Sequence, residues 1–162
     1  MCNVRYLLLF LPVLLLVTYT ESAFPVTANT EQGLSFGTII ANPSGDEIEI
    51  DARYGPATPV LISDGYSHIG DNGYSGIIRV RSDAPGQTIT LLYPDSVTLE
   101  AAGGVDTMPL YFINARSELT ATSTLADEDF YFDIGGRLHI KSGQLGLSYI
   151  GIMTVTINVT NP

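Results

Sequence analysis

The chain has 162 residues and a formal net charge of −10, from 7 Lys and Arg against 17 Asp and Glu. With 45% hydrophobic residues, 16 Gly and 9 Pro, it has the composition of a turn-rich folded domain, not of a disordered chain. So few basic residues argue against a nucleic-acid or anionic-membrane partner, because phosphate groups are bound by clusters of Lys and Arg. The length predicts one domain with a single core.

Residues 1–23 have the pattern of a secretory signal peptide. A basic residue precedes the apolar run Tyr6–Tyr19, and small residues lead up to Ala23. The run is shorter than the roughly 20 residues of a membrane-spanning helix. We therefore expect cleavage between Ala23 and Phe24. A cut after Ser22 and an uncleaved N-terminal anchor are the alternatives.

Cleavage there also removes Cys2, the only cysteine of the chain. The exported domain then has no disulfide, and its stability depends on its core and its backbone hydrogen bonds. No second apolar stretch near 20 residues follows, so we expect no membrane span after cleavage. The expected location is the periplasm, the cell surface or the extracellular space.

Apolar and polar residues alternate along much of the remaining chain, which predicts short β-strands. The segments with this pattern are residues 47–51, 78–81, 130–134, 137–141 and 149–160. Glycine- and proline-rich turns are expected at residues 42–45, 70–73, 83–86, 101–104 and 135–136. Residues 117–129 could hold one helical turn. Many short strands without long helical patterns predict an all-β fold, a single antiparallel β-sandwich at residues 33–162.

We expect no catalytic site and no cofactor. His68 lies in a loop rich in Asp and Gly, His139 lies on a solvated strand face, and neither has a metal-ligand partner at suitable spacing. Asp129 and Asp133 share a strand face about 13 Å apart, beyond the roughly 5–9.5 Å of paired glycosidase carboxylates.

Three further groups of residues are weighed as binding features. Glu47, Glu49 and Asp51 predict an exposed acidic ladder that keeps the domain soluble. Asp64–Asn72 and Asp127–Asp129 offer oxygen ligands for calcium but lack the EF-hand pattern, so solvated acids are the favoured interpretation. The aromatic residues that could stack on a sugar, with core packing as the alternative, are Tyr66, Tyr74 and Tyr93.

Short motifs between Gly33 and Val159 carry a family resemblance. They begin with Leu34-Ser35-Phe36-Gly37-Thr38-Ile39 and continue with Phe132-Asp133-Ile134-Gly135-Gly136-Arg137-Leu138 and Tyr149-Ile150-Gly151. The chain resembles a family of small secreted bacterial proteins catalogued as domain of unknown function 4402, which is similar in pattern to fimbrial (pilin-like) subunits. The family-like positions are Leu34, Phe36, Gly37, Gly135, Gly136, Leu138, Tyr149 and Gly151.

The resemblance implies an immunoglobulin-like or pilin-like sandwich, without catalysis, at the bacterial cell surface. In pilin-type assembly an N-terminal arm of one subunit adds a strand to the sheet of the next. Here the arm is expected at residues 24–32, with Phe24, Val26 and Ala28 as alternating donor positions. The alternative is that this segment is the first strand of the domain itself.

Two hypotheses for function follow. The leading one is a non-catalytic secreted protein, structural or adhesive, that resembles a fimbrial subunit and associates with itself or with other surface subunits by strand addition. The alternative is a monomeric extracellular module that binds glycan or calcium through the loop around Asp64–Tyr74.

Overall fold

The part of the chain that the structure describes folds into β-strands. The structure is a computed structural model and describes residues 13–19, 26–40, 46–50, 67–68, 73–113 and 118–161. In chain order the strands are β1 (Val13–Tyr19), β2 (Thr27–Gln32), β3 (Ile39–Ile40), β4 (Asp46–Ile50), β5 (Ser67–His68), β6 (Gly76–Arg81), β7 (Thr88–Leu92), β8 (Ser96–Ala101), β9 (Thr107–Phe112), β10 (Glu118–Thr122), β11 (Asp129–Ile134), β12 (Gly136–Ile140) and β13 (Tyr149–Thr160).

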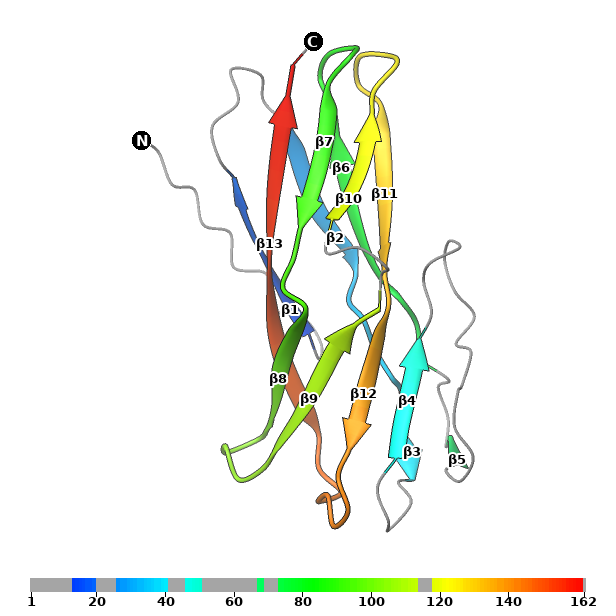
Figure 1. Cartoon of the computed structure of the whole chain (residues 1–162), viewed down its shortest axis with the longest axis vertical. Coiled ribbons are helices and arrows are strands. Elements are labelled where there is room, and N and C mark those ends of the chain that lie inside the picture. The colour runs from blue at the N-terminus through cyan, green and yellow to red at the C-terminus, as the bar shows by residue number, and fades with distance from the viewer. Residues whose placement is uncertain are drawn as a thin grey trace.

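These strands form two main sheets that pack face to face. The smaller sheet has the order β11-β6-β2, and the larger has the order β10-β7-β13-β8-β9-β12-β4, with β1 added beside β13. β3 and β5 form a separate pair. In Figure 1, β2 and β6 lie behind β7 and β13. The predicted all-β sandwich is confirmed.

The longest strand, β13, shows how alternation builds the core. Met153, Val155 and Ile157 are at most 1% exposed, whereas Ile150 and Ile152 on the other face are about half exposed. Because each residue points to the opposite face from its neighbour, one apolar set is buried between the sheets. The buried apolar cluster comprises Leu34, Phe36, Ile78, Val80, Ile89, Leu91, Tyr93, Leu99, Met108, Leu110, Phe132, Ile134, Leu138, Ile140, Met153, Val155 and Ile157.

The predicted strands correspond to β4, β6, β11, β12 and β13, and their bounds agree within one or two residues. The prediction of a helical turn within residues 117–129 is wrong for residues 118–122. Glu118–Thr122 is strand β10, which pairs along its whole length with Thr88–Leu92 of β7. Pairing with an existing sheet decides the conformation of so short a segment more strongly than its local propensity does.

The turn expected at residues 135–136 is also wrong. The chain passes there from β11 in the smaller sheet to β12 in the larger sheet, and neither glycine has a positive φ. A Cβ on Gly136 would lie 2.8 Å from Cδ1 of Leu110. Close packing at the change of sheet therefore accounts for this glycine.

Two similar loops connect the sheets at one end of the sandwich. Residues 82–87 join β6 to β7, and residues 123–128 join β10 to β11. The hydroxyls of Ser82 and Ser123 each donate a hydrogen bond to a backbone carbonyl of the opposite loop. Each loop therefore holds the other in place.

Candidate functional site

One strand pair differs from the rest and makes β13 the candidate site. β1 runs parallel to β13, with a register from Val13↔Gly151 to Tyr19↔Ile157. The other strand pairs that the structure describes are antiparallel. In Figure 1, β1 lies beside the middle of β13. We call the side of Gly151–Ile157 that faces β1 the β13 edge.

The other side of β13 has its own neighbours. Tyr149 and Ile150 pair with β8, and Thr156–Thr160 pair with β7. Thr156 and Ile157 pair with both β7 and β1, so these two strands lie on opposite sides of β13. Without β1, the β13 edge has no neighbour in the sheet order of the described residues, and its backbone groups are unpaired.

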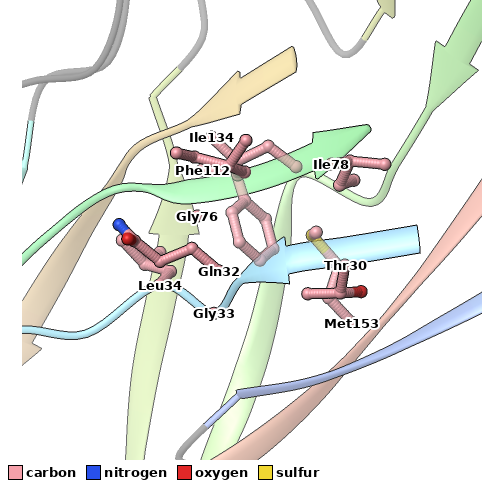
Figure 2. A pocket seen from close by; sticks show the side chains of 10 residues that line it. Thr30, Gln32, Gly33, Leu34, Gly76, Ile78, Phe112, Ile134 and Met153 are labelled. Atoms are coloured by element: carbon pink, nitrogen blue, oxygen red, sulfur yellow. The ribbon is translucent and has the colours of Figure 1, made fainter. Parts of the chain in front are cut away.

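The sheets leave a narrow apolar cavity of about 10 Å³ in the core, and Met153 is the residue of β13 that lines it. Figure 2 shows Met153 of β13 lining this cavity together with Thr30 of β2, so the two strands meet across the core. The volume holds at most about one water molecule. It is a packing gap in the core and is too small for an organic ligand.

The predicted acidic ladder is wrong for Glu49. This side chain is only 3% exposed, and its carboxylate accepts hydrogen bonds from Nη2 and Nε of Arg137 at 2.7 and 3.1 Å. A buried carboxylate requires such a partner, and Arg137 is its direct neighbour in the register of β4 and β12. Glu47 is half exposed and contacts Nδ1 of His139 at 3.2 Å, while Asp51 lies outside the described residues.

An open hollow of about 470 Å³ lies beside these charges and is lined by Glu47, Tyr111, Phe112, Ile113, Arg137 and His139. Its charged side chains already contact one another: Arg137 lies 3.9 Å from Glu47, which also contacts His139. The charged side chains that line the hollow are therefore engaged with one another.

The carboxylates of β11 also have structural partners. Asp129 accepts hydrogen bonds from Nε and Nη2 of Arg79 at 3.0 and 2.9 Å, and these bonds lower the pKa of Asp129. Burial raises the pKa of Asp133. Within the described residues, no group of three or more His, Cys, Asp or Glu side chains could hold a metal ion.

The aromatic and histidine candidates lie in different environments. Tyr93 is buried and packs edge-on against Phe112, with 5.9 Å between ring centroids, so it is a core residue. Tyr74 is partly exposed and forms a β-bridge with Ser35. His68 lies in β5, whereas Tyr66 and most of the Asp64–Asn72 loop lie outside the described residues.

The expected N-terminal arm lies partly in the domain's own sheet. Ala28 pairs with Val80 of β6, and both Val26 and Ala28 pack against the core. Residues 27–32 therefore form a first strand of the domain, which was the alternative to a donor arm. Ala23 and Phe24 lie outside the described residues. Donation of this segment to another copy stays a prediction, as does the cleavage site.

The described family-like positions have structural contacts. Leu34, Phe36 and Leu138 are core residues. The hydroxyl of Tyr149 donates to Oδ2 of Asp106 at 2.7 Å. A Cβ on Gly151 would lie 2.5 Å from the side chain of Leu99, so this position lies against β8.

Strand β1 is not predicted from the sequence. A continuous apolar run has no period of two, so it indicates the core of a signal peptide and not a strand. The available signal was its content of strand-forming residues, with Val, Thr and Tyr among the residues of VLLLVTY. That signal indicates a strand but does not indicate which neighbour it pairs with.

Comparison with known proteins gives a family match for the part of the chain that follows β1. In the described residues, no helix is long and apolar enough to cross a membrane. No curated protein and no solved structure matches the chain at a significant level. One family model, Domain of unknown function (DUF4402), matches residues 26–159, a span that starts just before β2 and ends within β13. This match covers most of the chain, which therefore belongs to the DUF4402 family.

Proposed function

We propose that this chain is a non-catalytic exported protein with a structural or adhesive role at the cell surface, similar to a fimbrial (pilin-like) subunit. In this proposal the β13 edge accepts a strand from another surface subunit. The observation that carries it is the parallel pairing of β1 with β13. β1 lies outside the family match and inside the expected signal peptide, so export would leave the β13 edge without its neighbour.

The order of the strands supports an immunoglobulin-like type that lacks its last strand. The orders β2-β6-β11 and β7-β13 correspond to strands A-B-E and C-F of an immunoglobulin sandwich. Strand G follows F in that fold and lies beside it. In this proposal β1 stands in for strand G, although it precedes the domain in sequence and runs parallel to β13.

An open edge at this position favours a partner. Its unpaired backbone groups would lie next to fully buried side chains such as Val155 and Met153. An added strand satisfies these groups with main-chain hydrogen bonds, and its alternating side chains supply specificity. This is the physical basis for expecting strand addition at the β13 edge.

The donor is expected to come from a different subunit. β1 covers the β13 edge with 7 residues. A donor made from residues 24–28 of another copy would have to release Thr27 and Ala28 from their pairs with Arg81 and Val80. That release costs backbone hydrogen bonds of about 0.5–1.5 kcal/mol each. A segment that is free before binding avoids this cost.

The proposal is tested on the protein exported from a bacterial host. The N-terminus is sequenced, the mass is measured by light scattering, filaments are sought by negative-stain microscopy, and backbone amide exchange is measured along Gly151–Ile157. We expect a start at Phe24, fast exchange at the β13 edge, and saturable binding of a peptide of residues 13–19 flanked by lysines.

A matched peptide with proline in place of both Leu15 and Leu16 is the control, because proline cannot donate a backbone hydrogen bond and one of these two adjacent amides faces β13. It should bind far more weakly. A monodisperse monomer whose edge amides are already protected, and which binds neither peptide, would contradict strand acceptance.

A further inference from the structure

We infer that the expected signal peptide, residues 1–23, blocks the β13 edge of its own chain. In the uncleaved chain, residues 13–19 of this leader occupy the β13 edge and exclude any other strand until they are removed. We call this blocking strand the cap, and we call the β13 edge the acceptor. This inference rests on the same edge as the proposed function and adds its regulation. Signal peptidases hydrolyse the leader bond. Water adds across the Ala23–Phe24 peptide bond, leaving a carboxylate on Ala23 and an amine on Phe24.

The pairing of β1 is continuous. All 7 of its residues have successive partners on β13 without a register shift. By comparison, the pairing of β2 with β6 is interrupted by a shift between Thr30 and Gln32. The leader therefore fits the β13 edge at least as regularly as this strand of the domain fits its own neighbour.

The chemistry of the leader suits this position. Its sequence VLLLVTY contains no charged residue. A strand beside β13 places alternate side chains on the face of Met153 and Val155, which are fully buried, so a charge at one of those positions would carry a large desolvation cost. The main-chain hydrogen bonds of the pair do not depend on side-chain identity, so an uncharged apolar strand is sufficient.

Cis pairing and strand acceptance exclude each other. One edge of β13 has a single row of backbone donors and acceptors, and β1 uses that row from Gly151 to Ile157. A tethered strand competes at an effective concentration on the order of millimolar. A partner strand at micromolar concentration is therefore kept out until cleavage removes the tether, after which another strand can displace the leader.

The test uses the full chain, produced without export and with a specific protease site inserted between residues 23 and 24. The chain folds with its leader attached and is cut only afterwards, so the result does not depend on refolding of a truncated protein. Before cutting, we expect protected amides along Gly151–Ile157 and no binding of labelled lysine-flanked peptide 13–19.

After cutting, residues 1–23 should stay with the domain until excess unlabelled peptide displaces them. Once they have been displaced and the peptide removed, exchange at the β13 edge should accelerate at least about tenfold. Labelled peptide should then bind at least about tenfold more tightly than to the uncut chain. The displaced fragment is identified by mass spectrometry.

A second variant does not require cutting. Replacing Leu15 and Leu16 with proline in the full chain removes two adjacent backbone donors, so that the strand cannot pair whichever of the two faces β13. This variant should bind the peptide without cleavage. If it binds no peptide while the cut wild-type chain does, the cap is wrong.

The outcomes separate this inference from the proposed function. If the peptide binds the uncut chain as tightly as it binds the cut chain from which residues 1–23 have been displaced, the cap is wrong and the acceptor proposal stands. Unprotected edge amides in the uncut chain would also overturn the cap. Edge amides that lose protection after leader removal, without binding of any peptide, would overturn the acceptor proposal and uphold the pairing in cis.

Discussion

Asp106 accepts hydrogen bonds that join the loop before β9 to residues near the start of β13. Its Oδ2 atom accepts from the hydroxyl of Tyr149 at 2.7 Å and from Nε2 of Gln144 at 2.6 Å, and its Oδ1 atom accepts from the amide of Thr107 at 2.8 Å. The bond from Tyr149 is the main cause that lowers the pKa of Asp106. The family-like Tyr149 therefore joins the start of β13 to the loop before β9.

Replacing Tyr149 with phenylalanine tests this contact through pH. A lowered folded-state pKa contributes stability above the unfolded pKa of about 3.9, and this contribution is lost as the pH falls through the folded pKa. We expect Tyr149→Phe to raise the pKa of Asp106 and to be less stable than wild type at pH 7, with a smaller difference at pH 2. Urea unfolding and carboxyl NMR titration measure the two effects. An equal stability difference at both pH values would contradict this account.

Gly151 allows the close approach of β13 to Leu99. Because a Cβ there would lie 2.5 Å from Leu99 Cδ2, we expect Gly151→Ala to overpack the core and to lower the free energy of unfolding by about 1–3 kcal/mol. Gly146→Ala is the matched control, since a Cβ at Gly146 meets no atom within 4 Å. Denaturant unfolding of both variants is the measurement. Equal effects of the two substitutions would exclude the steric explanation.

The two loops that connect the sheets have the same hydrogen bond at corresponding positions. Oε1 of Gln87 accepts from the amide of Asp83 at 3.2 Å, and Oε2 of Glu128 accepts from the amide of Thr124 at 2.6 Å. The residue before each of these side chains has a positive φ: 81° in one loop and 59° in the other. The first is Gly86, but the second is Asp127.

Asp127→Gly is therefore expected to stabilise the protein by up to about 1 kcal/mol, because an L-residue with a side chain pays a cost in this conformation. The contact of Asp127 with Arg81, 3.5 Å long and exposed, contributes little. Gly86→Ala in the other loop should destabilise by about the same amount. Thermal and urea unfolding measure both. A loss of stability for Asp127→Gly would show that the strain is absent.

Acidic residues exceed basic residues over the full chain, and the net charge is −10. Two arginines are committed to acidic partners within the sandwich, Arg79 with Asp129 and Arg137 with Glu49. The carboxylates in excess of the basic residues repel one another, and they are closer together in the folded state than in the unfolded chain.

Salt should therefore stabilise the folded protein at neutral pH. We expect the unfolding midpoint at pH 7 to rise between 10 and 200 mM NaCl, because the Debye length falls from about 30 Å to below about 10 Å. Near pH 4, where many carboxyl groups are protonated, the rise should largely disappear. Thermal unfolding in matched buffers is the measurement. A midpoint that falls with salt at pH 7 would show that ion pairs outweigh the repulsion.

The strands predicted from the sequence all have an alternation of apolar and polar residues that is visible within a few positions. Ile78 and Val80 alternate with Arg79 and Arg81 within a few residues, so a sheet with one buried face follows directly from the sequence. The candidate site was different. The apolar run that contains β1 has no such period, and its partner β13 lies at the opposite end of the sequence.

Three features follow from the amino-acid sequence: the all-β class, the half-buried last strand and the excess of acids. The first two depend on the period of neighbouring residues and the third on composition. Three others depend on the fold: β1 pairs with β13, Glu49 is buried against Arg137, and the chain changes sheet at Gly135. These features depend on which distant strands become neighbours. That choice is made by burial and backbone pairing across the whole sandwich, and no short segment encodes it.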